Sequence, residues 1–136
     1  MGFNFTKINV ERTGGSGENL KVNTNMDISD IDKAEIDFFK GKDEIIVAKF
    51  KYSINYSQDF AKIEFEGNII ISLNSKQAKN ALNDWKDKKV SDDIKHFVFS
   101  VILRKANVKA LQLEDEMNLP FHIPMPRISK DNEENN

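Results

Sequence analysis

The fold is decided by two neighbouring stretches, EIIVAKFKYSINY at residues 44–56 and AKIEFEGNIIISL at residues 61–73. In the first stretch the apolar positions from Ile46 to Tyr56 are even, and in the second those from Ile63 to Leu73 are mostly odd. Such alternation is typical of a strand with one buried face. The two stretches are therefore predicted to be antiparallel neighbours joined by a turn at residues 57–60.

The parity of the two stretches also predicts their register. The buried positions are even in the first stretch and odd in the second, so the numbers of two paired residues must add up to an odd value. A sum of 117 is compatible with a turn at residues 57–60. This register sets Phe50 opposite Gly67, where the missing side chain leaves room for the ring. The other face is then largely polar, with Lys51 opposite Glu66. One end of this polar face is apolar and consists of Ile45, Val47 and Ile70. An apolar patch of this kind often marks a subunit contact.

Two more strands are expected before this pair. Residues 3–12 alternate with a change of parity near Thr6 and Lys7, which predicts a bulge. A second strand is marked by alternate apolar residues from Leu20 to Ile28. The acidic stretch 29–44 that follows is predicted to be irregular, and its Phe38 and Phe39 either pack onto the edge of the core or line a binding groove.

The apolar spacing becomes helical after Leu73. A short helix capped by Asn74 or Ser75 is expected first, and Ser91 is expected to cap a long helix that ends near residue 118. The long helix carries two overlapping apolar faces, more than one face of a sheet is expected to cover. The residues that we expect at a subunit contact on the second apolar face are Ala106, Ala110 and Leu113.

These elements predict an α+β fold in which a four-stranded antiparallel sheet precedes a short and a long helix packed on one of its faces. At 136 residues the chain is expected to form a single domain over residues 1–128. A proline-containing segment ends the long helix, and residues 129–136 are predicted to be a disordered acidic tail.

Composition and motifs argue against catalysis. The chain has no cysteine and only two histidines, so thiolate chemistry and cysteine-based metal sites are excluded, and we expect no metal, no cofactor and no enzymatic activity. Neither His96 nor His122 has acidic or histidine residues at ligand spacing, and residues 114–116 are expected to form solvated acidic surface. No nucleotide-binding loop or nucleophile motif is recognisable.

The charge and the N-terminus suggest where the protein acts. A net charge of −2 argues against a nucleic acid partner. Residues 1–10 do not resemble a secretory signal, and no apolar run approaches the roughly 20 residues that span a bilayer. We therefore expect a cytoplasmic protein that does not insert into membranes.

The order of elements over residues 3–128 resembles that of the SecB-type export chaperones. The stretches that carry the resemblance are residues 20–25 (LKVNTN), the strands at 44–56 and 61–73, and residues 119–124 (LPFHIP). The resemblance implies a homodimer or homotetramer, with long helices between subunits and apolar grooves for unfolded clients. The groove candidates are Phe38, Phe39, Phe99 and Leu103.

The sequence departs from the family pattern at two places. Only residues 13–19 connect the first two strands, whereas SecB proteins have a long crossover there that walls the client groove. The tail lacks an apolar, basic segment of the kind that docks on the SecA motor, which makes SecA a doubtful partner.

The first hypothesis for function is therefore an ATP-independent holdase that binds unfolded or preprotein chains through exposed apolar grooves. The alternative is a structural or adaptor subunit of SecB-like fold that uses the same surfaces for a dedicated protein partner. An enzyme with convergent carboxylates ranks third.

Overall fold

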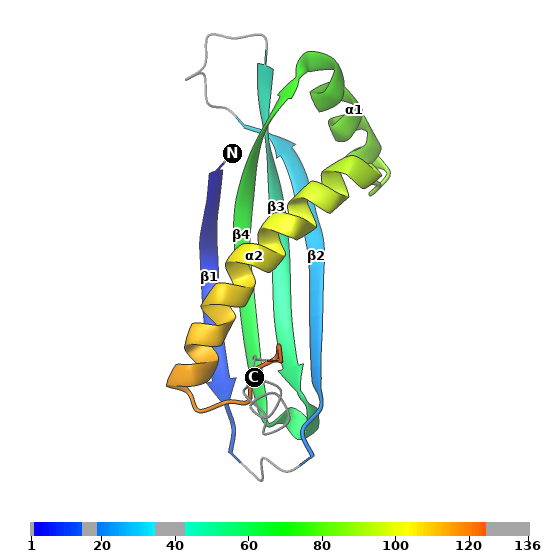
Figure 1. Cartoon of the computed structure of the whole chain (residues 1–136). Coiled ribbons are helices and arrows are strands. Elements are labelled where there is room, and N and C mark those ends of the chain that lie inside the picture. The colour runs from blue at the N-terminus through cyan, green and yellow to red at the C-terminus, as the bar shows by residue number, and fades with distance from the viewer. Residues whose placement is uncertain (1, 15–18, 35–42, 125–136) are drawn as a thin grey trace, which may run out of the picture.

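The computed structural model describes residues 2–14, 19–34 and 43–124, and contains one four-stranded antiparallel sheet followed by two helices (Figure 1). The order of the strands in the sheet is β1-β4-β3-β2. This architecture confirms the predicted α+β fold. The elements are β1 (Gly2–Arg12), β2 (Val22–Lys33), β3 (Asp43–Tyr56), the 3-10 turn η1 (Ser57–Asp59), β4 (Ala61–Asn74), α1 (Ser75–Lys86) and α2 (Asp92–Glu116).

The register between β3 and β4 is the predicted one. Phe50 lies opposite Gly67, and Lys51 lies opposite Glu66 on the other face. A Cβ atom at position 67 would stand 2.8 Å from the Phe50 ring and 2.4 Å from the carbonyl oxygen of Asn4, so only glycine fits there. The bulge in β1 is also confirmed, since its register against β4 shifts between Phe5 and Lys7.

The prediction for the segment after Ile28 was wrong in part. β2 continues to Lys33, and its register against β3 shifts between Ile28 and Asp30. The bulge turns Ile31 toward the core, where it is 4% exposed. Because Ile28 and Ile31 are three residues apart, the alternation that would have revealed this part of the strand is broken.

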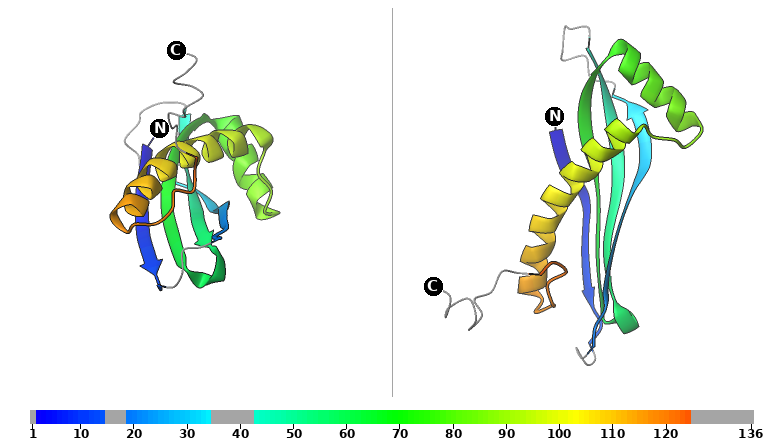
Figure 2. Two further views of the ribbon diagram at one scale, coloured as in Figure 1. Left: turned by 60° about the horizontal axis from the view of Figure 1, so that its bottom comes forward. Right: turned by 45° about the vertical axis from the view of Figure 1, so that its right-hand side comes forward.

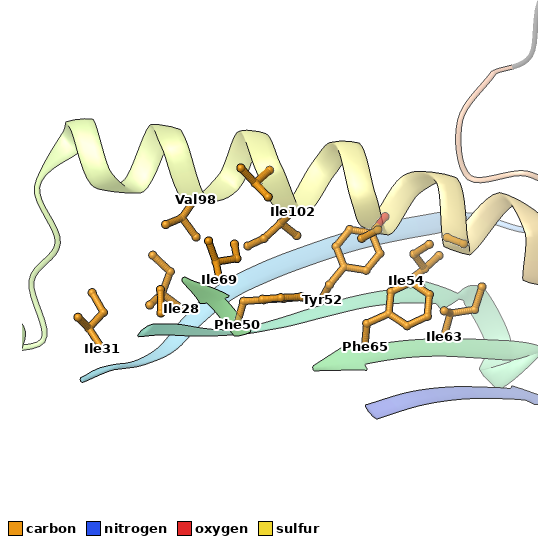
Figure 3. Packing of buried hydrophobic residues seen from close by; sticks show 14 of the residues in the cluster. Ile28, Ile31, Phe50, Tyr52, Ile54, Ile63, Phe65, Ile69, Val98 and Ile102 are labelled. Carbon is orange, nitrogen blue, oxygen red and sulfur yellow. The ribbon is translucent and has the colours of Figure 1, made fainter. Parts of the chain in front are cut away.

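The sheet and α2 form two layers. α2 runs obliquely across one face of the sheet, and α1 lies beside the end of the sheet where α2 begins (Figures 1 and 2). Val98 and Ile102 point from α2 toward Ile69, Phe50 and Tyr52 of the sheet (Figure 3). The opposite face of the sheet is covered by no helix of the described chain.

The oblique crossing explains how one face of the sheet can bury residues from both of the apolar faces predicted for α2. Its buried row advances by four residues at a time through Val98, Ile102, Ala106 and Ala110, each 0% exposed. A row with this spacing winds slowly around a helix of 3.6 residues per turn. One sheet face therefore buries part of both apolar faces, more than the sequence led us to expect.

The C-terminal end of α2 is held by a buried carboxylate. Glu114 is 0% exposed, which overturns the prediction that it belongs to a solvated acidic surface. The Tyr56 hydroxyl lies 2.5 Å from Oε2 of Glu114, to which it donates, and 2.6 Å from the carbonyl oxygen of Pro120. Nδ1 of His122 lies 2.8 Å from Oε1 of the same carboxylate. These contacts hold the segment after α2 against the end of β3.

A second tyrosine extends this network. The Tyr52 hydroxyl donates to Oδ1 of Asn107, 2.8 Å away, and lies 3.2 Å from Nε2 of His122. Burial raises the pKa of both tyrosines well above the ordinary value. The negative charge of Glu114 raises both further, and its hydrogen bond with Tyr56 adds to the effect there.

These raised pKa values predict a loss of stability at alkaline pH. Below about pH 10 both phenols are neutral in the folded and unfolded chains, and this stabilising contribution is complete. Above about pH 10 only the unfolded chain loses the protons, so the free energy of unfolding should fall by about 1.4 kcal/mol per pH unit for each tyrosine. In the Y56F variant only Tyr52 can ionise, so the free energy of unfolding should fall with pH at about half the rate of the wild-type protein.

The measurement is urea unfolding between pH 8 and about pH 11, combined with tyrosinate absorbance. The chain has only two tyrosines, so the absorbance reports this network alone. Tyrosinate absorbance that rises near pH 10 while the circular dichroism stays native would contradict the prediction.

Candidate functional site

A groove lies where β4 ends and the two helices meet. Its volume is about 610 Å³, which is within the range of ligand-binding pockets. β4 forms one side, α1 the second and the first turns of α2 the third. The groove is lined by Ile71, Ser72, Leu73, Gln77, Asn80, Ala81, Asp84, Ser91, Asp93, Ile94 and Phe97.

The groove exists because β4 is longer than its neighbour β1. The described pairing of β1 with β4 ends at Gly2 and Ile70, whereas β4 continues to Asn74 (Figure 1). On that side Ser72 and Leu73 have no strand partner among the described residues. The end of β4 therefore presents a backbone edge as well as side chains to the groove, and such edges accept extended peptides.

Two helix caps fix the walls of the groove. Asn74 accepts a hydrogen bond from the backbone of Gln77 and forms a capping box with it, which sets the direction in which α1 leaves β4. Ser91 accepts from the backbone of Ile94 at 3.3 Å and caps α2, as predicted. The Trp85 indole, on another side of α1, donates to Asp30 of β2 at 3.0 Å.

The groove combines an apolar lining with an acidic rim. Phe97 is 39% exposed, and Ile94, Ile71 and Leu73 contribute further apolar surface. The charged groups that line the groove are two carboxylates, those of Asp84 and Asp93, with no lysine or arginine. This arrangement can hold an extended apolar segment and favours one that also carries basic side chains.

The structure places two of the four predicted client-binding residues, Phe99 and Leu103, both on α2. Phe38 and Phe39 lie outside the described residues. Phe99 lines a second hollow, on the β2 side of the helices. Leu103 is 39% exposed on α2 and lines neither hollow.

The predicted subunit-contact residues separate into two groups. Val47 lies opposite Ile70 on the open face of the sheet, and Ile45 is beside them, all three partly exposed. Leu113 is partly buried against the core. Ala106 and Ala110 lie on α2 and belong to the buried core, each 0% exposed in the single chain.

The sequence reading missed the residues that line the groove. The sequence predicts apolar faces on the long helix, where Ile94 and Phe97 lie, and helix caps at positions 74 and 91. Their convergence with Leu73 follows from the unequal lengths of β1 and β4. The β3–β4 register could have suggested this, but the pairing of β1 with β4 could not be read from the pattern.

Other types of site are not seen in the described part of the chain. No group of three or more histidine or acidic residues is arranged to hold a metal ion there. The Glu114 and His122 side chains point to each other inside the network described above. No helix within these residues is long and apolar enough to cross a bilayer.

Comparison with known proteins supports the fold and leaves the family open. No protein-family model matches the sequence, and no curated protein matches it. The structure is similar to that of the Mycobacterium tuberculosis Rv1957 SecB-like chaperone, solved in complex with a ChAD peptide from the Rv1956 HigA1 antitoxin, with a TM-score of 0.52 and 10% sequence identity. The match covers 96% of this chain and 89% of that one. The chain therefore has a SecB-like fold.

Proposed function

We propose that this protein is a non-catalytic chaperone that holds unfolded polypeptide segments in the groove between β4, α1 and α2. The observation that carries the proposal is an apolar groove of about 610 Å³ along the end of β4, where Ser72 and Leu73 pair with no described strand on the β1 side. Extended chains of varied sequence share a backbone that can pair with such an edge, while apolar pockets select their side chains.

The energetics of this binding require no nucleotide. Transfer of apolar client side chains out of water releases about 25 cal/mol per Å² of buried surface. Binding to the unfolded chain and not to its folded form then delays aggregation by mass action. The acidic rim, Asp84 and Asp93, favours client segments in which lysine or arginine lies beside apolar residues.

An adaptor for one dedicated partner is the second candidate. It is supported by the structural neighbour, which is described in complex with a peptide of an antitoxin. Both functions would use the same groove, and they differ in selectivity. An adaptor would bind one partner tightly and would leave unrelated denatured proteins to aggregate.

The proposal predicts that the purified protein suppresses aggregation of chemically denatured model proteins, and that F97S weakens this activity. Burial of the exposed part of Phe97 by a client is worth about 1 kcal/mol, so the apparent affinity should fall about fivefold. Light scattering during dilution from denaturant measures the effect. The matched control is F121S, because Phe121 is similarly exposed, at 42%, and does not line the groove.

The sequence-based candidates can be tested in the same assay. F38S with F39S should weaken holding without unfolding the domain if those rings border the groove. Wild-type protein that fails to suppress aggregation of any model client, even in molar excess, would contradict the holdase proposal and favour the adaptor.

We also propose that the chain self-associates through the apolar end of the open sheet face, Ile45, Val47 and Ile70. Light scattering coupled to gel filtration should give a mass of two or four times 15.6 kDa. V47E places a charge opposite Ile70 and should reduce this mass, whereas K49E on the same face should not. A stable monomer in the wild-type protein would contradict this proposal.

A further inference from the structure

A second hollow lies on the other side of the helix pair. Its volume is about 510 Å³, and it opens between the bulged part of β2, the end of α1 and the first turns of α2. It is lined by Asp27, Ile28, Ser29, Lys51, Trp85, Lys88, Val90, Lys95 and Phe99. It shares no lining residue with the groove described above.

Two lysines of this hollow are placed over aromatic rings. Nζ of Lys88 lies 4.7 Å from the centroid of the Trp85 ring, and Nζ of Lys95 lies 5.7 Å from that of Phe99. Both distances are within the range of cation–π attraction. The Trp85 ring is itself fixed, because its indole donates to the Asp30 carboxylate at 3.0 Å. The two ammonium groups are therefore localised at the hollow by rings that the fold holds in place.

Within the described part of the chain, no ion pair balances the charge of these two lysines. Neither Lys88 nor Lys95 forms an ion pair with any described residue, whereas Lys51 lies 3.8 Å from a carboxylate oxygen of Glu66. The lining contains three lysines and only one carboxylate, that of Asp27. A cationic hollow with an apolar base is complementary to an anionic group attached to apolar atoms.

We propose that this hollow docks an acidic segment of a partner protein, one in which glutamate or aspartate lies next to a large apolar side chain. The carboxylates would contact Lys88 and Lys95, and the apolar side chain would enter the hollow against Phe99 and Val90. The inference does not depend on the proposed holdase function, because it rests on different residues and on the opposite charge.

A protein segment fits this hollow better than a nucleic acid does. Proteins that bind single strands stack bases on free aromatic faces. Here each of the two rings carries a lysine ammonium over one face.

The placement of α1 keeps the two docking sites distinct. Asp84 lines the acidic groove, and its neighbour Trp85 lines the basic hollow, so adjacent residues of one helix face opposite charge environments. A basic apolar segment and an acidic apolar segment could thus be bound at the same time without competition.

The test is fluorescence anisotropy with two labelled peptides on the full-length protein. One peptide alternates glutamate with phenylalanine and leucine, and the other has lysine in place of each glutamate. We expect the acidic peptide to bind to the wild-type protein. The K88E/K95E variant should bind this peptide about tenfold more weakly, and added salt should weaken the binding to the wild-type protein. The matched control is K76E/K79E, which reverses two exposed lysines of α1 that line neither hollow.

Further variants separate this site from the holdase groove. K88R/K95R should retain binding of the acidic peptide, since it keeps both charges, and F97S should leave it unchanged. An equal effect of K88E/K95E on binding of the lysine peptide, or an equal loss of acidic-peptide binding in K88E/K95E and K76E/K79E, would overturn the proposal. It would also be overturned by a single-stranded oligonucleotide or anionic vesicles that bind with the same dependence on Lys88 and Lys95 while the acidic peptide does not bind.

Discussion

The contact between Phe50 and Gly67 is the constraint on which the rest of the structure depends. The ring occupies the space that any other residue at position 67 would fill, so it locks β3 and β4 into one register. Phe3 of β1 stacks on the same ring at 5.4 Å between centroids, which ties the edge strand to this point. A shift of one residue would turn every side chain of the pair to the wrong face. The apolar layer beneath α2 therefore depends on this contact.

The register also determines where the groove lies. With Gly2 opposite Ile70, the last residues of β4 extend past β1, and the chain turns there into α1. The groove is the space between this overhang and the first turns of α2. Ile94 and Phe97 lie in the first turns of α2. The oblique path of the helix places these turns beyond the part of the sheet in which β1 pairs with β4.

Local patterns predicted the strands, the β3–β4 register, the bulge in β1 and both helix caps, because each depends on residues close together in the chain. The role of Glu114 could not be predicted in this way. Its partners, Tyr56 and His122, lie 58 and 8 residues away, and a glutamate on a helix surface is usually solvated. The end of β2 was missed for a different reason, since the bulge at residue 29 hides its alternation. The groove itself required knowledge of which strand pairs with β4.

An apolar groove that stays open must be held by contacts outside itself, because its own residues would gain by closing over one another. Three such contacts are present here. The capping box of Asn74 sets α1, the Trp85 indole anchors α1 to Asp30, and buried Glu114 secures the far end of α2. None of the three contacts involves the apolar side chains of the groove. Changes at Phe97 leave these supports intact, whereas changes at Glu114 act on the core, so variants at Phe97 test the proposed binding separately from folding.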